Sequence, residues 1–243
     1  ESARVKQVIV LEGGIGEAGA RAVISHTGAL AGSDKVWDVL LRQAGAIRVY
    51  SLEELVDMAV TFSYLPLPLG RRAGVIGSGG GATVLATDDC TNAGLLVPCL
   101  PITIQDKLKS YLGKGGIGVG LSNPVDLSDQ GWGIFCDCAK IMLDCDRIDL
   151  LIAYLNAGIF RPSQIPELLT IVKDIVKSHK ESNKPVAMVI GSVVSTEAWP
   201  VALDCQRECC ESHLPVYHSL SNAAKAIARF LDYHEHRFAR GQN

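Results

Sequence analysis

Continuous apolar runs mark the expected strands of this chain. Four short stretches carry apolar residues without polar alternation, namely Val8–Leu11, Ala73–Ile76, Leu150–Leu155 and Val186–Ile190. Strands that are buried on both faces have this pattern, and parallel sheets are built from such strands. The runs therefore predict strands inside a parallel sheet.

Amphipathic stretches lie between and after these runs. Within residues 167–177 the apolar side chains fall on one helical stripe, made by Leu168, Ile171, Val172, Ile175 and Val176. Ser51 followed by Glu54 has the spacing of a capping box and predicts that a helix begins there. Alternation of strands and helices indicates a doubly wound α/β fold with a parallel sheet.

A proline-rich stretch and a weak internal repeat indicate two parts. Residues 66–70, with proline at alternate positions, predict an extended linker between residues 1–65 and 71–243. Val8–Gly13 resembles Val186–Gly191, so the first part resembles the second half of a domain that the second part contains whole. Two strands and two helices cannot cover both faces of a parallel sheet. We therefore expect the first unit to be incomplete at its N-terminus and the chain to come from a longer polypeptide.

Composition narrows the class of protein. The 243 residues are 48% hydrophobic, and 23 basic against 26 acidic residues give a net charge of −3. Such a balance disfavours nucleic acid and anionic membrane as partners. The apolar runs are too short to span a bilayer, and the start has no signal-peptide pattern. We expect a cytoplasmic protein whose eight cysteines are reduced and structural, with no metal site.

One histidine lies in a segment of small residues. Residues 17–34 follow a predicted strand and precede a predicted helix, and His26 is surrounded there by serine, threonine, glycine and alanine. Small neighbours allow a bulky group to approach closely. We expect a loop in which the imidazole is free to move or to meet a phosphate, although a lone histidine in such a loop is also compatible with an incidental role.

Two glycine-containing turns follow predicted strands. Gly79, Gly80 and Gly81 come after the run at 73–76 and precede a predicted helix, while Asn156, Ala157 and Gly158 come after the run at 150–155. Ligands of open α/β sheets bind beyond the carboxyl ends of the strands, and helix N-termini favour anions. Both turns are candidates for binding a phosphate or acyl phosphate, and both are also compatible with ordinary tight turns.

Nearly thirty consecutive residues around His26 carry a family resemblance. The run EAGARAVISHTGALAGSDKVWDVLLRQAG resembles the phosphohistidine segment of the NDP-forming acyl-CoA synthetases, which include the ADP-forming acetate–CoA ligases and the succinyl-CoA synthetases. The later runs RRAGVIGSGGGATVLATDDCTNAGL, SNPVDL and LIAYLNAGIFRP resemble the flavodoxin-like ligase domain that follows it. The resemblance implies two flavodoxin-like units, covering 1–65 and 71–243.

The resemblance implies a phosphoryl relay. Acyl-CoA and phosphate give an acyl phosphate and free CoA, the acyl phosphate phosphorylates a histidine, and that histidine passes the group to ADP or GDP. By this resemblance His26 is the catalytic residue, and Asn156–Gly158 lies at the helix start that faces it. Imidazoles suit the role because an ordinary pKa of about 6.5 leaves a neutral, nucleophilic nitrogen near pH 7.

Some family features are weak or altered here. The family orients its histidine with a carboxylate upstream of residue 1, and Glu17 is a weak candidate for that role within the segment. Related sequences usually carry a basic residue near the positions of Glu12 and Ile15, which are acidic and apolar in this chain. Asp126, in SNPVDL, is expected to be a turn and packing residue.

The resemblance also implies partners and substrates. An ATP-grasp domain or subunit and a CoA-binding Rossmann domain would supply CoA and the NDP or NTP with Mg²⁺ as substrates, with no tightly bound cofactor, in an oligomeric assembly. The chain alone would then be an incomplete ligase. A non-catalytic regulatory or ligand-binding module, such as part of an acetyltransferase fusion, is the alternative.

A dinucleotide fingerprint is the rival motif. Gly14-x-Gly16-x-x-Gly19 follows a predicted strand, as the nicotinamide and flavin fingerprint requires. That fingerprint also needs an acidic residue at the end of a second strand about twenty positions later, where this sequence has a segment of small residues. Nicotinamide or flavin binding is therefore disfavoured.

Overall fold

The computed structural model describes residues 6–27, 34–111, 120–127, 132–160, 162–191, 193 and 195–239. The chain folds into two compact units, the first made of residues 1–59 and 229–243 and the second of residues 60–228. Two helices, α4 (Leu52–Tyr64) and α10 (Leu220–Ala239), pass from one unit into the other. The first unit thus contains residues from both ends of the sequence. The predicted boundary at the 66–70 linker differs, because it assigns the C-terminal residues to the second part.

The second unit is built on a five-stranded parallel sheet with the order β4-β3-β5-β6-β7. Numbered by their order along the chain, the strands follow the flavodoxin-like order 2-1-3-4-5. The predicted parallel α/β fold is confirmed. The strands are β3 (Ala73–Gly77), β4 (Val125–Asp126), β5 (Leu150–Asn156), β6 (Val186–Gly191) and β7 (Val216–Tyr217).

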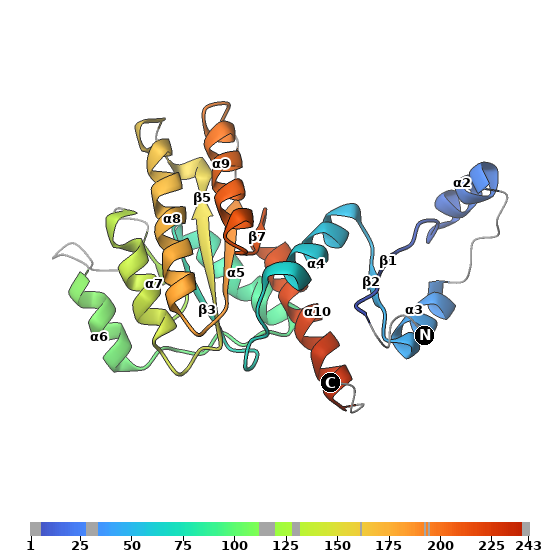
Figure 1. Cartoon of the computed structure of the whole chain (residues 1–243), viewed down its shortest axis with the longest axis horizontal. Coiled ribbons are helices and arrows are strands. Elements are labelled where there is room, and N and C mark those ends of the chain that lie inside the picture. The colour runs from blue at the N-terminus through green and yellow to red at the C-terminus, as the bar shows by residue number, and fades with distance from the viewer. Residues whose placement is uncertain are drawn as a thin grey trace. The chain divides into compact units, whose positions relative to one another are not determined.

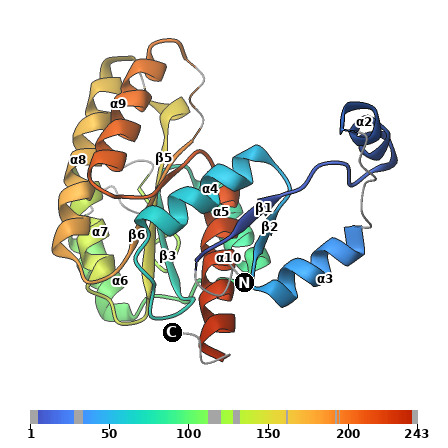
Figure 2. The same cartoon turned by 45° about the vertical axis from the view of Figure 1, so that its right-hand side comes forward.

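Helices cover this sheet. Figures 1 and 2 show α7, α8 and α9 side by side along one face, with α5 on the other. No helix among the described residues combines the length and apolar character needed to cross a membrane. The helices are α5 (Gly80–Ala93), α6 (Ile102–Tyr111), α7 (Phe135–Leu143), α8 (Ile165–Glu181) and α9 (Ala198–Glu211), with short 3₁₀ helices at Trp132–Ile134, Ala157–Ile159 and Pro162–Gln164.

The apolar runs form the core of the second unit. Every residue of β3 and β6 is buried, and so is all of β5 except its last residue, Asn156. Helix α8 turns its apolar stripe toward this sheet, as its predicted periodicity requires. Burial on both faces explains why these strands carry no polar alternation.

The first unit has a two-stranded parallel sheet. Strand β1 (Ile9–Leu11) pairs with β2 (Ile47–Val49) in the register Val10 to Arg48. Two helices, α2 (Glu17–Thr27) and α3 (Asp34–Ala44), lie between these strands in the sequence. Helix α3 buries one residue, Leu41, and leaves four large apolar side chains exposed: Val36, Trp37, Val39 and Leu40.

The segment around His26 is helical where it is described, and the predicted loop is wrong there. Residues 17–27 form α2, with Glu17 in its first turn and His26 in its last. Alanine, which occurs three times in this stretch, and arginine, which occurs once, are among the best helix formers, so their propensity outweighs that of the serine and glycine residues. Residues 28–33 of the predicted loop lie outside the described residues.

Candidate functional site

His26 is an exposed imidazole at the end of a helix. Its side chain is open to solvent on α2 and makes no hydrogen bond or ion pair with any residue that the structure describes. Ser25, its neighbour, instead binds back to the carbonyl of Arg21 at 3.0 Å. An exposed ring without a fixed partner can be reached by a phosphoryl donor.

Glu17 does not orient His26 in this structure. The two residues stand at opposite ends of α2, nine positions apart. At 1.5 Å of rise per residue, that spacing separates their Cα atoms by roughly 14 Å along the axis, which is beyond hydrogen-bonding reach. The solvent-exposed Glu17 is better described as an acidic residue in the first turn, where it complements the helix dipole.

Both glycine-containing turns lie at the topological switch point of the second unit. Strand β3 pairs with β4 on one side and with β5 on the other, so the chain direction along the sheet reverses between β3 and β5. Gly77 is in register with Tyr154, so Gly79 follows the carboxyl end of β3, and Asn156, the last residue of β5, ends the adjacent strand. Open α/β sheets bind ligands in the crevice at this position. The structure therefore places the two predicted turns at the same end of the sheet, where the adjacent strands β3 and β5 finish.

The carboxylate of Asp126 already contacts the first turn, Gly79–Gly81. Gly79, the N-cap of α5, adopts φ 108° and has its N–H 3.1 Å from Asp126 Oδ1. The other carboxylate oxygen lies 3.1 Å from the position that a Cβ on Gly80 would take. Asp126 is thus more than the turn residue that the sequence suggests. A phosphate at this helix start would share it with a negative charge.

The second turn is shaped by its own side chain. Asn156 Oδ1 accepts a hydrogen bond of 3.0 Å from the N–H of Gly158, which caps the 3₁₀ helix Ala157–Ile159. Ala157 is buried, whereas Gly158 is exposed. The predicted helix start is therefore a single 3₁₀ turn, and α8 begins only at Ile165.

A buried hydroxyl lies between the strand and the first turn. Ser78 is 1% exposed, and its Oγ has no hydrogen-bond partner among the described residues. Sequence reasoning passed over Ser78 because serine before glycine is common in turns. Its burial at a strand end was the missing signal.

Sequence reasoning also missed Arg48. This arginine occupies the centre of β2 with a side chain only 6% exposed. Its Nη2 donates to Glu12 Oε2 at 2.8 Å and to Asp34 Oδ1 at 2.5 Å, and its Nη1 donates to the Asp34 carbonyl at 3.1 Å. A charge between Ile47 and Val49, in an otherwise apolar strand, was the signal available in the sequence.

Several buried thiols are poor nucleophiles. All eight cysteines are free, and five are buried. Burial raises the pKa of Cys90 to about 12 and that of Cys138 to about 11, in both cases with help from a neighbouring aspartate. Burial also raises the pKa of Cys205 to about 12. A thiol of this kind stays protonated near neutral pH and does not attack substrate.

Metal and dinucleotide chemistry find little support. No group of three or more histidine, cysteine, aspartate or glutamate side chains is arranged for a metal within the described ranges. Gly14, at φ 85°, does begin a tight turn into α2. A Cβ added to Gly19 would lie 3.0 Å from the Cα of Gly14. Strand β2, however, ends at Val49 and is followed by Tyr50, Ser51 and Leu52, so the acidic residue of the dinucleotide fingerprint is lacking.

Comparison with known proteins identifies the relatives. Residues 1–62 match the family described as succinyl-CoA ligase like flavodoxin domain. Over 230 residues, 94% of this chain, the sequence is 30% identical to the alpha subunit of ADP-forming acetate–CoA ligase I from Pyrococcus furiosus, of which it spans 47%. Over 122 residues, half of the chain, it is 40% identical to the ADP-forming 4-hydroxybutyrate–CoA ligase of Nitrosopumilus maritimus, of which it spans 17%.

A solved structure agrees in fold. The dinucleotide forming acetyl-coenzyme A synthetase 1 of Candidatus Korarchaeum cryptofilum, in complex with phosphate and ADP, matches with a TM-score of 0.78 at 24% identity. The match covers 97% of this chain and 48% of that one. The chain thus spans about half the length of these relatives or less. The predicted resemblance is confirmed: residues 1–62 match the succinyl-CoA ligase like flavodoxin domain, and the chain is similar over most of its length to ADP-forming acyl–CoA ligases.

Proposed function

We propose that this chain is the phosphoryl-carrying part of an NDP-forming acyl-CoA synthetase, with His26 as the carrier. The observation that carries the proposal is the exposed imidazole of α2, inside the 62 residues that match the ligase family. Covalent transfer through a side chain divides one difficult transfer into two easier ones. An exposed group at a helix end has the access that both transfers need.

The relay has two balanced steps. In the first, a neutral imidazole nitrogen of His26 attacks the phosphorus of an acyl phosphate, the bond from phosphorus to the acyl oxygen breaks, and the carboxylate leaves. In the second, a terminal phosphate oxygen of ADP or GDP attacks the same phosphorus, the bond from phosphorus to nitrogen breaks, and the imidazole is regained. The reverse order makes an acyl phosphate from NTP. Acyl-CoA and phosphate enter through formation of the acyl phosphate with release of CoA.

The switch point of the second unit would receive the phosphoryl group. The turn at Asn156–Gly158 and the start of α5 at Gly79–Gly81 lie at the carboxyl ends of the adjacent strands β5 and β3, the position at which open α/β sheets bind ligands. Asp126 makes the α5 side less favourable for phosphate, so we assign the phosphoryl group chiefly to the Asn156–Gly158 side. The unpartnered hydroxyl of Ser78 is one more donor at this edge.

Other parts of the machinery would come from outside the chain. We propose an ATP-grasp domain or subunit that holds the nucleotide with Mg²⁺, a CoA-binding Rossmann domain, and a cytoplasmic, oligomeric assembly. These proposals rest on the sequence similarity to the alpha subunit from Pyrococcus furiosus and to the longer ligases. The carboxylic acid and the choice between ADP and GDP stay open.

Radioactive labelling tests the proposal. The protein, together with its ATP-grasp domain or partner, is incubated with γ-labelled ATP and Mg²⁺, and the label is followed on the chain. We expect a label that is lost in acid and stable in base, and that vanishes in His26→Asn. His236→Asn is the matched control, since His236 is also exposed in the last turn of a helix of the first unit. A competent enzyme without label, or an unchanged label in His26→Asn, would favour the binding or regulatory alternative.

A further inference from the structure

One buried arginine joins the two ends of the segment that carries His26. Glu12 follows β1 directly, and Asp34 is the first residue of α3. Both carboxylates accept from the same nitrogen, Arg48 Nη2, at 2.8 and 2.5 Å. A single guanidinium group therefore contacts one residue before and one residue after helix α2, which carries His26.

The chemistry of this cluster suits a fixed anchor. Arginine keeps its charge and offers a planar fork that can hold two acceptors in a defined geometry, which lysine cannot reproduce. The Nη1 atom adds a third bond, to the main-chain carbonyl of Asp34, so the clamp also holds the backbone at the start of α3. With the Arg48 side chain 6% exposed and that of Glu12 17% exposed, solvent screens this ion pair little, whereas Asp34 is 48% exposed and its pair with Arg48 is screened more.

The cluster is not explained by the simple satisfaction of a buried arginine. Arg48 Nε is buried and has no partner among the described residues, although the guanidinium makes three bonds with its other two nitrogens. The side chain is thus placed so that it contacts Glu12 and Asp34 at once, while its Nε makes no hydrogen bond with any described residue. Such placement points to a role in holding these two positions together.

We propose that Arg48 is a positioning residue for His26, because it clamps together Glu12 and Asp34, which lie before and after the helix that carries the histidine. The inference rests on the phosphoryl-carrying function proposed above. A histidine that reacts first with a phosphoryl donor and then with an acceptor benefits from a fixed anchor for its segment, because the anchor limits the positions that the imidazole samples. Displacements of about 1 Å in a reacting group can cost roughly 100-fold in rate.

Kinetic comparison of matched variants tests the clamp. Arg48→Met removes the guanidinium, Arg48→Lys keeps the charge without the fork, and Asp34→Asn removes one of the two carboxylates. Asp38→Asn is the control: Asp38 lies one turn further along α3, where it pairs at 2.6 Å with the exposed Arg42. Each variant is assayed in the complete protein or with its ATP-grasp partner, and His26 phosphorylation is followed in single-turnover experiments with γ-labelled ATP.

The expected result is a slower transfer at unchanged nucleotide affinity. We expect the first-order rate of labelling to fall about 10- to 100-fold in Arg48→Met and Asp34→Asn, and less in Arg48→Lys, with the KM for ATP unchanged. Asp38→Asn should match the wild type. Hydrogen exchange should become faster in residues 13–27 of the slow variants and stay unchanged in β5 and β6, which would separate release of the clamp from unfolding.

Failure of the clamp and failure of the relay give different results. If the wild type takes up no label on His26, the proposed function fails, and the inference that rests on it fails as well. If the wild type is labelled, and Asp34→Asn and Arg48→Lys are labelled at the same rate although exchange in 13–27 has risen, the positioning role alone is overturned. Should Arg48→Met fail to fold, those two variants still decide the question.

Discussion

The two units of this chain differ in how completely they bury their own apolar surface. In the second unit, strands β3, β5 and β6 are almost entirely buried between helices, and a single core cluster connects α7, α8 and α9. In the first unit, the two strands support α3 with one buried residue, Leu41, and four exposed apolar side chains. The candidate carrier His26 belongs to the first unit, while the two turns proposed to bind phosphate belong to the second.

This contrast teaches where stability and chemistry reside. A parallel sheet is stable when helices cover both faces, and in the first unit α3 still leaves four large apolar side chains exposed. The second unit is therefore expected to dominate the free energy of unfolding of the chain. The first unit keeps its best-defined interaction, the Arg48 clamp, at the base of the segment that would carry the phosphoryl group.

The largest effect should come from a cavity in the second unit. Leu155, in β5, is fully buried, and we expect Leu155→Ala to lower the free energy of unfolding by about 2–5 kcal/mol. Leu40→Ala on α3, where the leucine is 52% exposed, should change it by less than about 0.5 kcal/mol. Urea denaturation of both variants measures the difference. Equal losses would show that the apolar face of α3 is covered after all.

A smaller effect is expected at the cap of α4. Ser51 Oγ accepts from the N–H of Glu54 at 3.1 Å, and Glu54 reaches back to the N–H of Tyr50 at 2.9 Å. Ser51→Ala should cost about 1 kcal/mol, because it leaves a helix N–H without its acceptor. Ser63→Ala, on the exposed side of the same helix, is the control. Thermal unfolding in which the two variants behave alike would argue against the cap.

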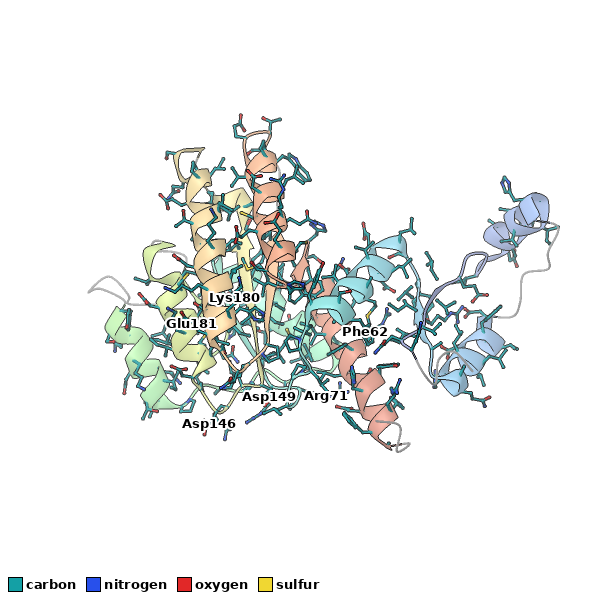
Figure 3. All side chains as sticks on the ribbon, in the orientation of Figure 1. Phe62, Arg71, Asp146, Asp149, Lys180 and Glu181 are labelled. Carbon is teal, nitrogen blue, oxygen red and sulfur yellow. The ribbon has the colours of Figure 1, made fainter. Side chains whose placement is uncertain are left out.

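The smallest effect concerns stability in acid at the end of the sheet where the strands begin. Figure 3 shows Asp149, Asp146 and Arg71 at the end of the unit where β3 and β5 begin. Burial opposes ionisation of Asp149, but hydrogen bonds from the Arg72 side chain and backbone outweigh it and hold the pKa of this carboxyl below its ordinary 3.8. Stability from this pair is therefore present above pH 3.8 and is lost as the pH falls through the lowered value.

Acid titration of stability checks this sign. Asp149→Asn should be less stable than the wild type at neutral pH, and the difference should shrink as the pH falls below about 4. Asp106→Asn, an exposed position on α6, should run parallel to the wild type. A difference between Asp149→Asn and the wild type that does not depend on pH would mean that the pair stabilises through packing alone.

Local sequence patterns were sufficient for the long strands and for β1, but insufficient for β2, β4 and β7. The runs that became β3, β5 and β6 could be recognised because burial on both faces leaves only apolar residues. Strand β4 has two residues, Val125–Asp126, and too short a pattern to be recognised. The segment of α2 was predicted to be a loop because glycine and serine favour loops, although its alanines and its arginine favour a helix.

The site shows the same limit. His26 and the two glycine-containing turns could be selected from the sequence, because each depends on a local motif. The bond between Asp126 and Gly79 joins residues far apart in the chain, and the Arg48 clamp joins three separate segments. Contacts of that kind depend on strand order and register, which local patterns do not specify.

Direct chemical location of the phosphate tests the central claim. The protein is phosphorylated with its nucleotide partner, digested at high pH to protect phosphoramidates, and the phosphopeptides are sequenced by mass spectrometry. The account predicts one phosphorylated imidazole, that of His26, whose phosphate is lost when ADP is added. A phosphate on any other residue of the chain, or a phosphorylated His26 that cannot return its phosphate to ADP, would contradict it.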